Sequence, residues 1–575
     1  MRGVEEEEGR SIVSNLKEKA VVIVGRAYNS LDKGINLNIS KKLSDLGVMS
    51  IPMDFLPLES SSVDRDWPNM YWRAGQRILG AARIVRSSPS LFALYIGNFS
   101  CGPDSFISKY FDEEMSGKPY LHLEIDEHSA DAGAITRCEA FLDSIENKEY
   151  ESQKAGVGEK VHGEISQHGL RTADHGSRTV YLPRMSDHAF AVAGAFEYCG
   201  VDAEVLPEPT KDAVDLGRKY VSGKECYPCA VTTGDMVKKI MEPGFRPDRS
   251  AFFMPSGSGP CRFGQYNIFH KLVIKEIGFD NVPVFAPNQD ENFYEHLGIV
   301  GKDFALRSWA GIVAIELLNK CCRQTRPYEK EKGNSDAVYD EYLKRAYMSI
   351  RGMDGDIGEV LKKARREFET IPTARERKPL IGIVGEIFVR SNAFSNENLV
   401  RKIEALGGEA YLAPVEEWLY YINFTGLRRI LIKKEWSGMI KLLLKRFFQK
   451  RIERRLGRHF KGFLKALHEP ETKELLEKAG PYIHPSFEGE AILSIGKGID
   501  LISRRASGLI SAMPFGCMPG TIVSGLMRGL STDFGIPCLS IPYDGSESVT
   551  TEIQLEAFMD QAREYDKKIQ AGGLP

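Results

Sequence analysis

The sequence predicts an α/β protein built from several Rossmann-like, doubly wound units with parallel sheets, two of which are copies of each other. Short apolar runs that end in a glycine or a turn alternate with helical patterns, as in βαβ units. One such pattern occurs twice at a constant spacing. A chain of 575 residues, 42% hydrophobic and 27% charged, has the composition of a globular protein with about three or four domains.

The first unit opens with an apolar strand at residues 20–24, a glycine-bounded loop at 25–34, and an amphipathic helix that stops at a glycine. A second opening of the same kind starts near residue 378. Three pairs of matching positions each differ by 360 residues: Val24 and Val384, Asn36 and Asn396, Gly47 and Gly407. The spacing therefore predicts a duplicated α/β unit.

The ends of the two copies also match, because Glu-Ala-Phe follows at a similar distance after Cys101 and after Cys517. Here the spacing has grown to 416 or 417 residues, so the second copy carries an insertion of nearly sixty residues. A third α/β pattern lies between the copies. The expected organisation is a first unit at 1–149, a linker at 150–178, a middle unit at 179–325, a helical bridge at 326–377, and the second copy at 378–575 with a basic helical insertion at about 420–480.

The segment from Gly223 to Cys229 contains two cysteines that can bind one metal centre. They are Cys226 and Cys229, in a Cys-x-x-Cys spacing. Two intervening residues let both sulfurs face one point. This spacing serves iron–sulfur clusters, zinc ions and thiol redox couples. The pair alone does not choose among them.

Three further cysteines each follow a short apolar run and a turn, namely Cys101, Cys261 and Cys517. Ligands in open α/β sheets gather at such strand ends. Glycine and proline around each sulfur leave backbone N–H groups available to a negatively charged cluster. We therefore predict an iron–sulfur cluster held by Cys101, Cys226, Cys229, Cys261 and Cys517, with zinc as the alternative. The other five cysteines fall within helix or strand patterns that are typical of core packing.

The formal net charge of −3 is unevenly spread. Residues 427–465 hold fourteen Lys and Arg and two Glu, which leaves −15 for the rest of the chain. Apolar residues recur in this stretch at helical spacing. It is interpreted either as a solvated helix that covers a sheet or as a docking surface for an acidic partner, a CoA phosphate or an anionic membrane. For the docking alternative the expected residues are Arg451, Arg454, Arg455 and Arg458.

The remaining composition limits the cellular context. No apolar run is long enough to cross a membrane, and the N-terminus has no secretory h-region, so a cytoplasmic protein is expected. Ten unevenly spaced cysteines in so long a chain favour reduced thiols or metal ligands over a disulfide framework. Nucleic acid is not among the expected partners.

Several of these motifs resemble one known family. They are Gly25-Arg-Ala-Tyr-Asn with Asn36, Asn98-Phe-Ser-Cys101-Gly-Pro-Asp, Glu124-Ile-Asp-Glu-His128, Thr136-Arg-Cys-Glu-Ala-Phe141, Gly223-Lys-Glu-Cys226-Tyr-Pro-Cys229, Pro514-Phe-Gly-Cys517-Met-Pro-Gly-Thr521 and Tyr543-Asp-Gly545. The chain is similar in these places to the component D group of 2-hydroxyacyl-CoA dehydratases. Relatives of that group are the C-terminal part of the large CoA-substrate-specific enzyme activases and the double-cubane cluster proteins.

The resemblance implies a [4Fe–4S] cluster or a larger double-cubane cluster between Rossmann-like lobes, reduced by an ATP-dependent activase. The activase portion has no counterpart in this sequence, so a separate polypeptide is the expected partner. The expected function is an iron–sulfur redox protein that passes low-potential electrons to an acyl-CoA or another small substrate, as a single chain or within a homo- or hetero-dimer. The alternative is a metal-stabilised binding or regulatory module of an activase complex. The resemblance leaves open whether the chain is itself an enzyme.

Overall fold

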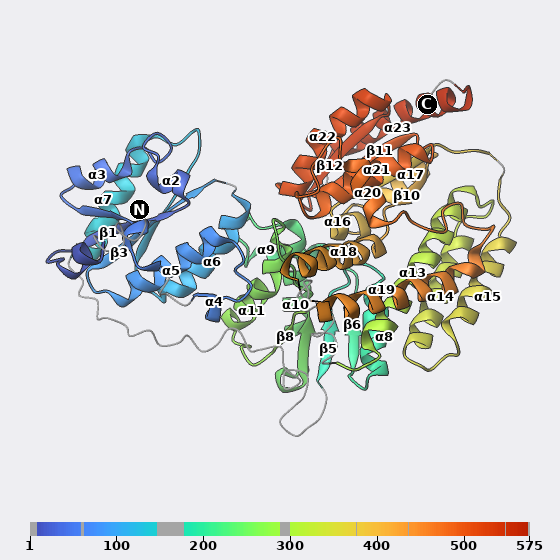
Figure 1. Ribbon diagram of the computed structural model, residues 1–575, viewed down its shortest axis with the longest axis horizontal. Helices are drawn as coiled ribbons and strands as arrows, with labels where there is room; N and C mark the ends of the chain where they lie inside the picture. Colours follow the sequence, from blue (N-terminus) through green and yellow to red (C-terminus); the bar gives the residue numbers. More distant parts are fainter. Residues whose placement is uncertain are drawn as a thin grey trace. The chain divides into compact units, whose positions relative to one another are not determined.

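The computed structural model describes residues 9–58, 63–99, 101–146, 178–287, 300–374, 376–434, 436–546 and 548–572. These residues divide into two compact units. The small unit holds the described residues up to Glu146 together with Ser222–Glu225, and the large unit holds the remainder (Figure 1). Except for Arg178, the predicted linker at 150–178 lies outside the described residues.

The small unit is one parallel sheet with helices on both faces. Its strand order is β2-β1-β3-β4, and helices α3 and α7 cover one face while α5 packs on the other beside α6. The strands are β1 (Ala20–Gly25), β2 (Met49–Pro52), β3 (Leu91–Asn98) and β4 (Tyr120–Ile125). The helices are α2 (Ala27–Leu31), α3 (Ile39–Asp45), α4 (Val63–Asp66), α5 (Arg73–Ser87), α6 (Gly102–Met115) and α7 (Asp131–Glu146).

The second copy, in the large unit, has the same topology, with the strand order β10-β9-β11-β12. Its strands are β9 (Leu380–Gly385), β10 (Glu409–Leu412), β11 (Gly508–Pro514) and β12 (Cys538–Tyr543). Its helices are α16 (Ile387–Ser391), α17 (Leu399–Ala405), α18 (Glu416–Lys433), α19 (Trp436–Gly457), α20 (Thr472–Ala479), α21 (Glu490–Ser503), α22 (Met518–Phe534) and α23 (Val549–Gln570).

The predicted duplication is confirmed in detail by the backbone. Val21 pairs with Phe92 in the first copy, and Ile381 pairs with Gly508 at the matching positions of the second. Asn38 and Asn398, which are 360 residues apart, both adopt the left-handed region, with φ of 52° and 58°. The two copies therefore share turn geometry as well as strand order.

The middle unit contains a third parallel sheet with an equivalent order, β6-β5-β7-β8. Its strands are β5 (Thr179–Leu182), β6 (Ala203–Val205), β7 (Ser250–Phe253) and β8 (Val284–Phe285), and its helices are α8 (Ala189–Tyr198), α9 (Lys211–Arg218), α10 (Tyr227–Ile240) and α11 (Tyr266–Glu276). The expectation of several doubly wound parallel units is therefore confirmed. That all three sheets have equivalent strand orders was not predicted.

The predicted helical bridge corresponds to two helices, α14 (Asn334–Ile350) and α15 (Ile357–Thr370), which follow the long helix α13 (Phe304–Thr325). They share one apolar core with α8 and with the C-terminal end of α19. Trp309 on α13 is buried there, and its indole N–H donates to the carbonyl of Gln449 on α19 at 3.0 Å. The bridge is thus part of the large unit's core. No described helix has the length and apolarity that crossing a membrane requires.

Candidate metal and substrate site

Four of the predicted cysteines lie in the first turns of helices of the large unit. Cys226 is the N-cap of α10, and Cys229 is the third residue of that helix. Cys261 caps the 3₁₀ helix Arg262–Gln265, and Cys517 caps α22. Helix N-termini present unpaired N–H groups and a partial positive charge, which favour an anionic sulfur. The four residues Cys226, Cys229, Cys261 and Cys517 are called the cysteine site below.

The strand order explains why these segments meet. In an order such as β10-β9-β11-β12, the crevice for ligands opens between the first and third strands of the sequence, where the chain direction around the sheet reverses. Cys517 follows the third strand of the second copy, β11, and Cys261 follows the third strand of the middle unit, β7. Each sheet of the large unit therefore places one cysteine at its switch point, the crevice between its first and third strands.

The thiols of the cysteine site act on one another electrostatically. Burial raises the pKa of Cys261 well above its ordinary value, and the charges of Glu490, Cys517 and Cys226 raise it further. Burial likewise raises the pKa of Cys517, and Cys226 is the next largest cause. Arg262 joins the two sheets directly, because its Nη2 donates to the carbonyl of Gly516 at 3.0 Å. Three segments far apart in the sequence therefore form one site.

Two buried polar side chains accompany the thiols. Burial would lower the pKa of Arg262, but the charges of Cys226, Tyr266, Cys517 and Cys261 outweigh it and the pKa is raised. Tyr266 has a raised pKa because of its burial and then because of Cys226, Cys229 and Cys261. The guanidinium of Arg262 thus offsets negative charge on the sulfurs.

Helix α10, which carries the Cys-x-x-Cys pair, lies in backbone contact with α9 through two glycines. A Cβ atom on Gly217 would lie 2.0 Å from the carbonyl oxygen of Ala230, and one on Gly234 would lie 1.8 Å from that of Ala213. Neither position accepts another residue without moving a helix. The two glycines therefore fix the position of the first turn of α10.

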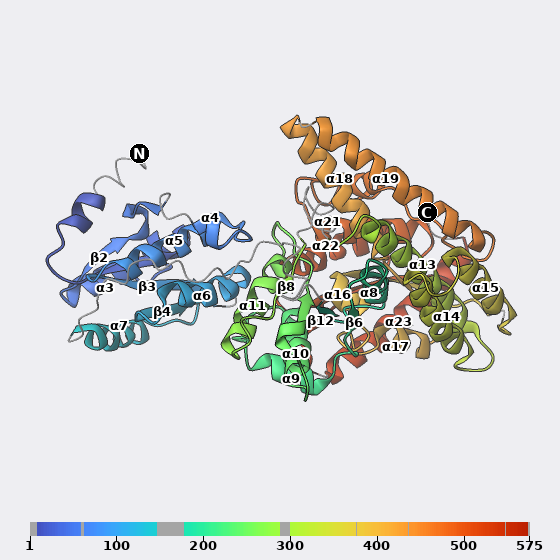
Figure 2. The same ribbon diagram turned by 90° about the horizontal axis from the view of Figure 1, so that it is seen from below.

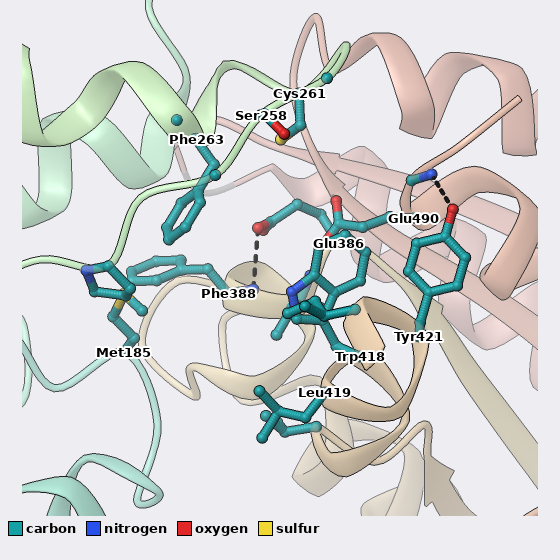
Figure 3. A pocket seen from close by; sticks show the side chains of 18 of the residues that line it. Met185, Ser258, Cys261, Phe263, Glu386, Phe388, Trp418, Leu419, Tyr421 and Glu490 are labelled. Carbon is teal, nitrogen blue, oxygen red and sulfur yellow. Dashed lines mark hydrogen bonds between the residues drawn. The ribbon is translucent and has the colours of Figure 1, made fainter. Parts of the chain in front are cut away.

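A largely apolar cavity of about 280 Å³ adjoins the cysteine site within the large unit. Cys261 lies in its wall (Figure 3). Met185, Phe388, Trp418 and Leu419 supply apolar lining (Figure 3). This main cavity has the character of a small-molecule site, since such sites combine apolar walls with a few polar groups.

The polar groups of the main cavity include two carboxyls, Glu386 and Glu490 (Figure 3). Glu386 caps α16 and accepts hydrogen bonds from the N–H groups of Phe388 at 3.1 Å and Val389 at 2.7 Å. Glu490 accepts one bond, from the N–H of Ile387 at 3.1 Å. Burial, followed by the charge of Glu386, raises the pKa of Glu490 to about 8. Burial raises the pKa of Glu386 as well, although its two N–H donors and the charge of Arg390 oppose this, so the buried pair favours holding a proton over two carboxylates.

Cys101 occupies the equivalent place in the small unit, as the N-cap of α6 after β3. The charges of Asp104 and Arg26 act on its thiol. These two residues form an ion pair, with 2.9 Å between Nε of Arg26 and Oδ1 of Asp104. Burial raises the pKa of the Cys101 thiol, and Asp104 raises it further. The structure thus brings together four of the five predicted ligands in the large unit and places Cys101 in the small one.

A single zinc ion requires its thiolate ligands to lie close together. Thiolates on one tetrahedral zinc, each about 2.3 Å from the metal, lie about 3.8 Å apart. Within the described part of the chain, one group of three His, Cys, Asp or Glu residues has ligand atoms within 4.8 Å of one another. It consists of Asp126, Glu127 and His128 at the surface. No three thiols of the cysteine site are that close. Four cysteines can serve one zinc or the four irons of a [4Fe–4S] cluster, so zinc and a cluster are both candidates for the cysteine site.

The basic insertion forms helices α18 and α19, which lie side by side (Figure 2). The interpretation of a helix that covers a sheet needs correction, because α19 packs mainly on α13 and α18. Its C-terminal part buries Leu456, yet an apolar patch on its N-terminal part is exposed, with Phe447 59% and Phe448 46% accessible. The patch also contains Ile440, Leu443 and Leu444.

Several residues of the site could not be identified from sequence motifs. Glu386 and Glu490 are not part of any charged pattern, and Arg262 lies beside Cys261 without a distinctive spacing. Glu386 could have been found from the duplication. It aligns with Arg26, so the residue directly after the matched strand is acidic in one copy and basic in the other.

The family model of the CoA enzyme activase uncharacterised domain matches residues 2–56, which include β1 and β2 of the first copy. The chain thus carries a CoA-enzyme-activase-related segment, while the finer resemblance to component D is not shown. No curated protein matches the chain.

Proposed function

We propose that the cysteine site holds an iron–sulfur cluster and that the protein accepts low-potential electrons from a separate ATP-dependent activase. The main support is the convergence of Cys226, Cys261 and Cys517 from three segments, each at the start of a helix. The match to a CoA-enzyme-activase-related domain agrees with such a partner. When bound, the cluster supplies one-electron transfer at low potential.

The main cavity is the proposed substrate site, and its residues suggest how a substrate is held. Apolar walls formed by Phe388, Trp418 and Leu419 exclude water and accept an acyl chain. Glu490 is protonated at neutral pH and so can donate to a carbonyl or hydroxyl oxygen. An acyl-CoA fits this combination, with its reactive end in the cavity.

Around the thiols, the chain's own residues stabilise negative charge. The N-termini of α10 and α22 direct their N–H groups toward the site, and the cation of Arg262 is buried among the sulfurs. Burial of uncompensated charge is costly, so a thiolate or cluster site of this kind needs such compensation. Cys101 is the fifth candidate, either as a spare thiol or as part of a larger, double-cubane assembly.

Anaerobic purification with iron and sulfide analysis tests the proposal. We expect about four irons and four sulfides per chain for one cubane, and about eight irons for a double-cubane cluster. Cys226→Ser or Cys229→Ser should remove most of the cluster absorbance, and Cys199→Ser, which alters a cysteine at the end of α8, is the matched control. Zinc without sulfide would instead support the metal-stabilised binding module, and full iron in both variants would exclude the loop as a ligand.

A further inference from the structure

A much smaller cavity shares Glu490 with the lining of the main cavity. It has a volume of about 10 Å³ and is lined by Arg390, Glu417, Glu490, Ser494 and Lys497, with a few apolar neighbours. A cavity of roughly 10–15 Å³ holds one water molecule when two to four polar groups surround it. Glu490, Ile387 and Trp418 line both cavities, so the two cavities adjoin at these residues.

Two buried polar atoms on residues that line the small cavity have neither a hydrogen-bond partner nor an ion pair among the described residues, namely Oε2 of Glu490 and Nε of Arg390. Their residues are only 8% and 7% exposed. An unsatisfied buried polar atom costs free energy, which an ordered water would recover. The volume and these two atoms independently indicate the same occupant, a single bound water.

The far side of the small cavity leads into a buried network of charges. Glu417 pairs with Lys497 at 2.7 Å, and Lys497 also contacts Asp500 at 3.5 Å. Asp500 pairs with Lys478 at 2.9 Å, and Lys478 pairs with Glu474 at 3.0 Å. Glu474 is 52% exposed, so the network runs from the small cavity to the surface without an apolar gap.

We propose that a water molecule in the small cavity connects Glu490 with Glu417, so that protons reach the main cavity from the buried charge network. When Glu490 gives its proton to a group in the main cavity, it becomes a carboxylate. A proton passes to Glu417 from the side of Lys497 and Asp500, and the water donates a proton to Glu490 and takes this one from Glu417, which returns to the carboxylate paired with Lys497. No electron moves in this step.

The charges around both carboxyls are compatible with this exchange. Burial raises the pKa of Glu417, while Lys497 opposes that effect most strongly. At Glu490, burial and Glu386 favour the protonated form, and Arg390 favours the charged form. Each carboxyl thus lies beside a cation that stabilises its charged form after the proton has left. The relay goes beyond the proposed electron transfer, although a reduction in the main cavity would use its protons.

The relay is tested by filling the small cavity without touching either carboxyl. Ser494→Val places methyl groups in the cavity and excludes the water, whereas the matched control Ser494→Ala leaves room for it. A high-resolution crystal structure should show the water in the wild type and in Ser494→Ala and its absence in Ser494→Val. A wild-type cavity without water would overturn the proposal.

Proton exchange gives the decisive measurement. The infrared C=O band of protonated Glu490 is identified by its loss in Glu490→Gln, and its shift after transfer to D2O reports exchange. We expect exchange at least tenfold slower in Ser494→Val than in the wild type and Ser494→Ala. Equal rates in all three would show that protons arrive through the main cavity and would contradict the relay.

If Ser494→Val does not fold, Glu417→Gln removes the transferable proton and should slow the same exchange, and an unchanged rate would again contradict the relay. These measurements need neither iron nor an identified substrate. A protein without iron therefore refutes the proposed cluster but not the relay, and a missing water refutes the relay but not the cluster.

Discussion

The first and second copies share a backbone and differ in the charges beside their switch-point cysteines. After β1 the first copy has Arg26, which pairs with Asp104 on α6. After β9 the second copy has Glu386 at the matching position, and α22 has Gly520 where α6 has Asp104. In one copy the cation and the carboxylate beside the cysteine pair with each other, although Nη2 of Arg26 and Oδ2 of Asp104 have no hydrogen-bond partner among the described residues. In the other, carboxyls and thiols are left facing a cavity.

This difference shows how a duplicated frame can separate a structural role from a chemical one. An ion pair of opposite charges leaves little net charge for a ligand. Buried acidic groups such as Glu386 and Glu490 are costly unless they serve binding or proton transfer. We therefore expect the second copy to be the chemically active one.

The largest expected effect is on metal content. Cys517→Ser should lose most of the iron and the cluster absorbance, because the Cys517 thiol shares its site with Cys226 and Cys261. The matched variant Cys101→Ser should keep at least about three quarters of the iron if a single four-iron cluster is present. Equal losses in the two variants would remove the asymmetry between the copies and favour a larger cluster that uses both.

A change of stability is expected when the ion pair of the first copy is broken. Arg26→Ala leaves the carboxylate of Asp104, a residue that is 6% exposed, without its cation. Removing one partner of a buried pair costs about 3–5 kcal/mol, and the partial exposure of Arg26 places the expected loss near about 3 kcal/mol. Chemical unfolding measures it, with Arg137→Ala on the exposed face of α7 as control. A loss no greater than that of the control would show that the pair is not what stabilises this copy.

The basic insertion is present in the second copy alone, so reversing its charges tests whether the added helices serve the partner. Arg451, Arg454, Arg455 and Arg458 are exposed and form no salt bridge with any described residue. Changing all four to Glu should slow reduction by the activase about tenfold at low salt and much less at high salt, since exposed charges act mainly on encounter rates. Iron content should not change.

The matched control reverses four exposed cations elsewhere in the large unit, Lys332, Lys344, Lys363 and Arg366. If both quadruple variants slow reduction equally, only net charge matters, and the docking interpretation of the insertion fails. A partner that uses the exposed apolar patch as well should also respond to Phe447→Ser.

The smallest expected effect concerns pH. Two residues before β4 the first copy has Lys118, whereas the second has Ile536 two residues before β12. Burial lowers the pKa of Lys118 to about 8, although its ammonium donates to the carbonyl of Val85 at 2.9 Å. An unfolded lysine titrates near about 10.4, so between these values the unfolded state binds more protons and stability rises with pH.

Lys118→Met removes this titration. The free energy of unfolding of the wild type, relative to the variant, should therefore increase from pH 8 to pH 10. Because the group is partly screened by solvent, the increase should stay well below about 1.4 kcal/mol per pKa unit. A difference that is flat across this range would mean that the buried ammonium is not destabilised.

The sequence predicted much of the frame because strand and turn patterns are local. The spacing of 360 residues identified equivalent turns, and the structure confirms them at Asn38 and Asn398. The cysteines at strand ends also stand where that reasoning placed them. The similarity of the middle sheet to both copies was not recognised, because β6 and β8 have only three and two residues.

The chemistry around the thiols could not be predicted in the same way. Arg262 joins the cysteine site through a bond to Gly516, 254 residues away, and Glu490 reaches the main cavity from the start of α21. Such contacts depend on how separate sheets pack, which no local pattern reports. The exposed apolar residues of α19 illustrate the same limit, since helical spacing indicates an apolar face but not whether another element covers it.

The contact of Gly217 and Gly234 between α9 and α10 has a consequence for electron transfer. The rate of such a reaction falls when atoms must rearrange as charge arrives. A helix pair in backbone contact leaves the first turn of α10 little room to move between oxidation states. A methyl group at either glycine would force the helices apart and would move the turn that carries Cys226 and Cys229. For the proposed cluster, part of the speed of its reduction would thus be set by two residues that carry no functional group.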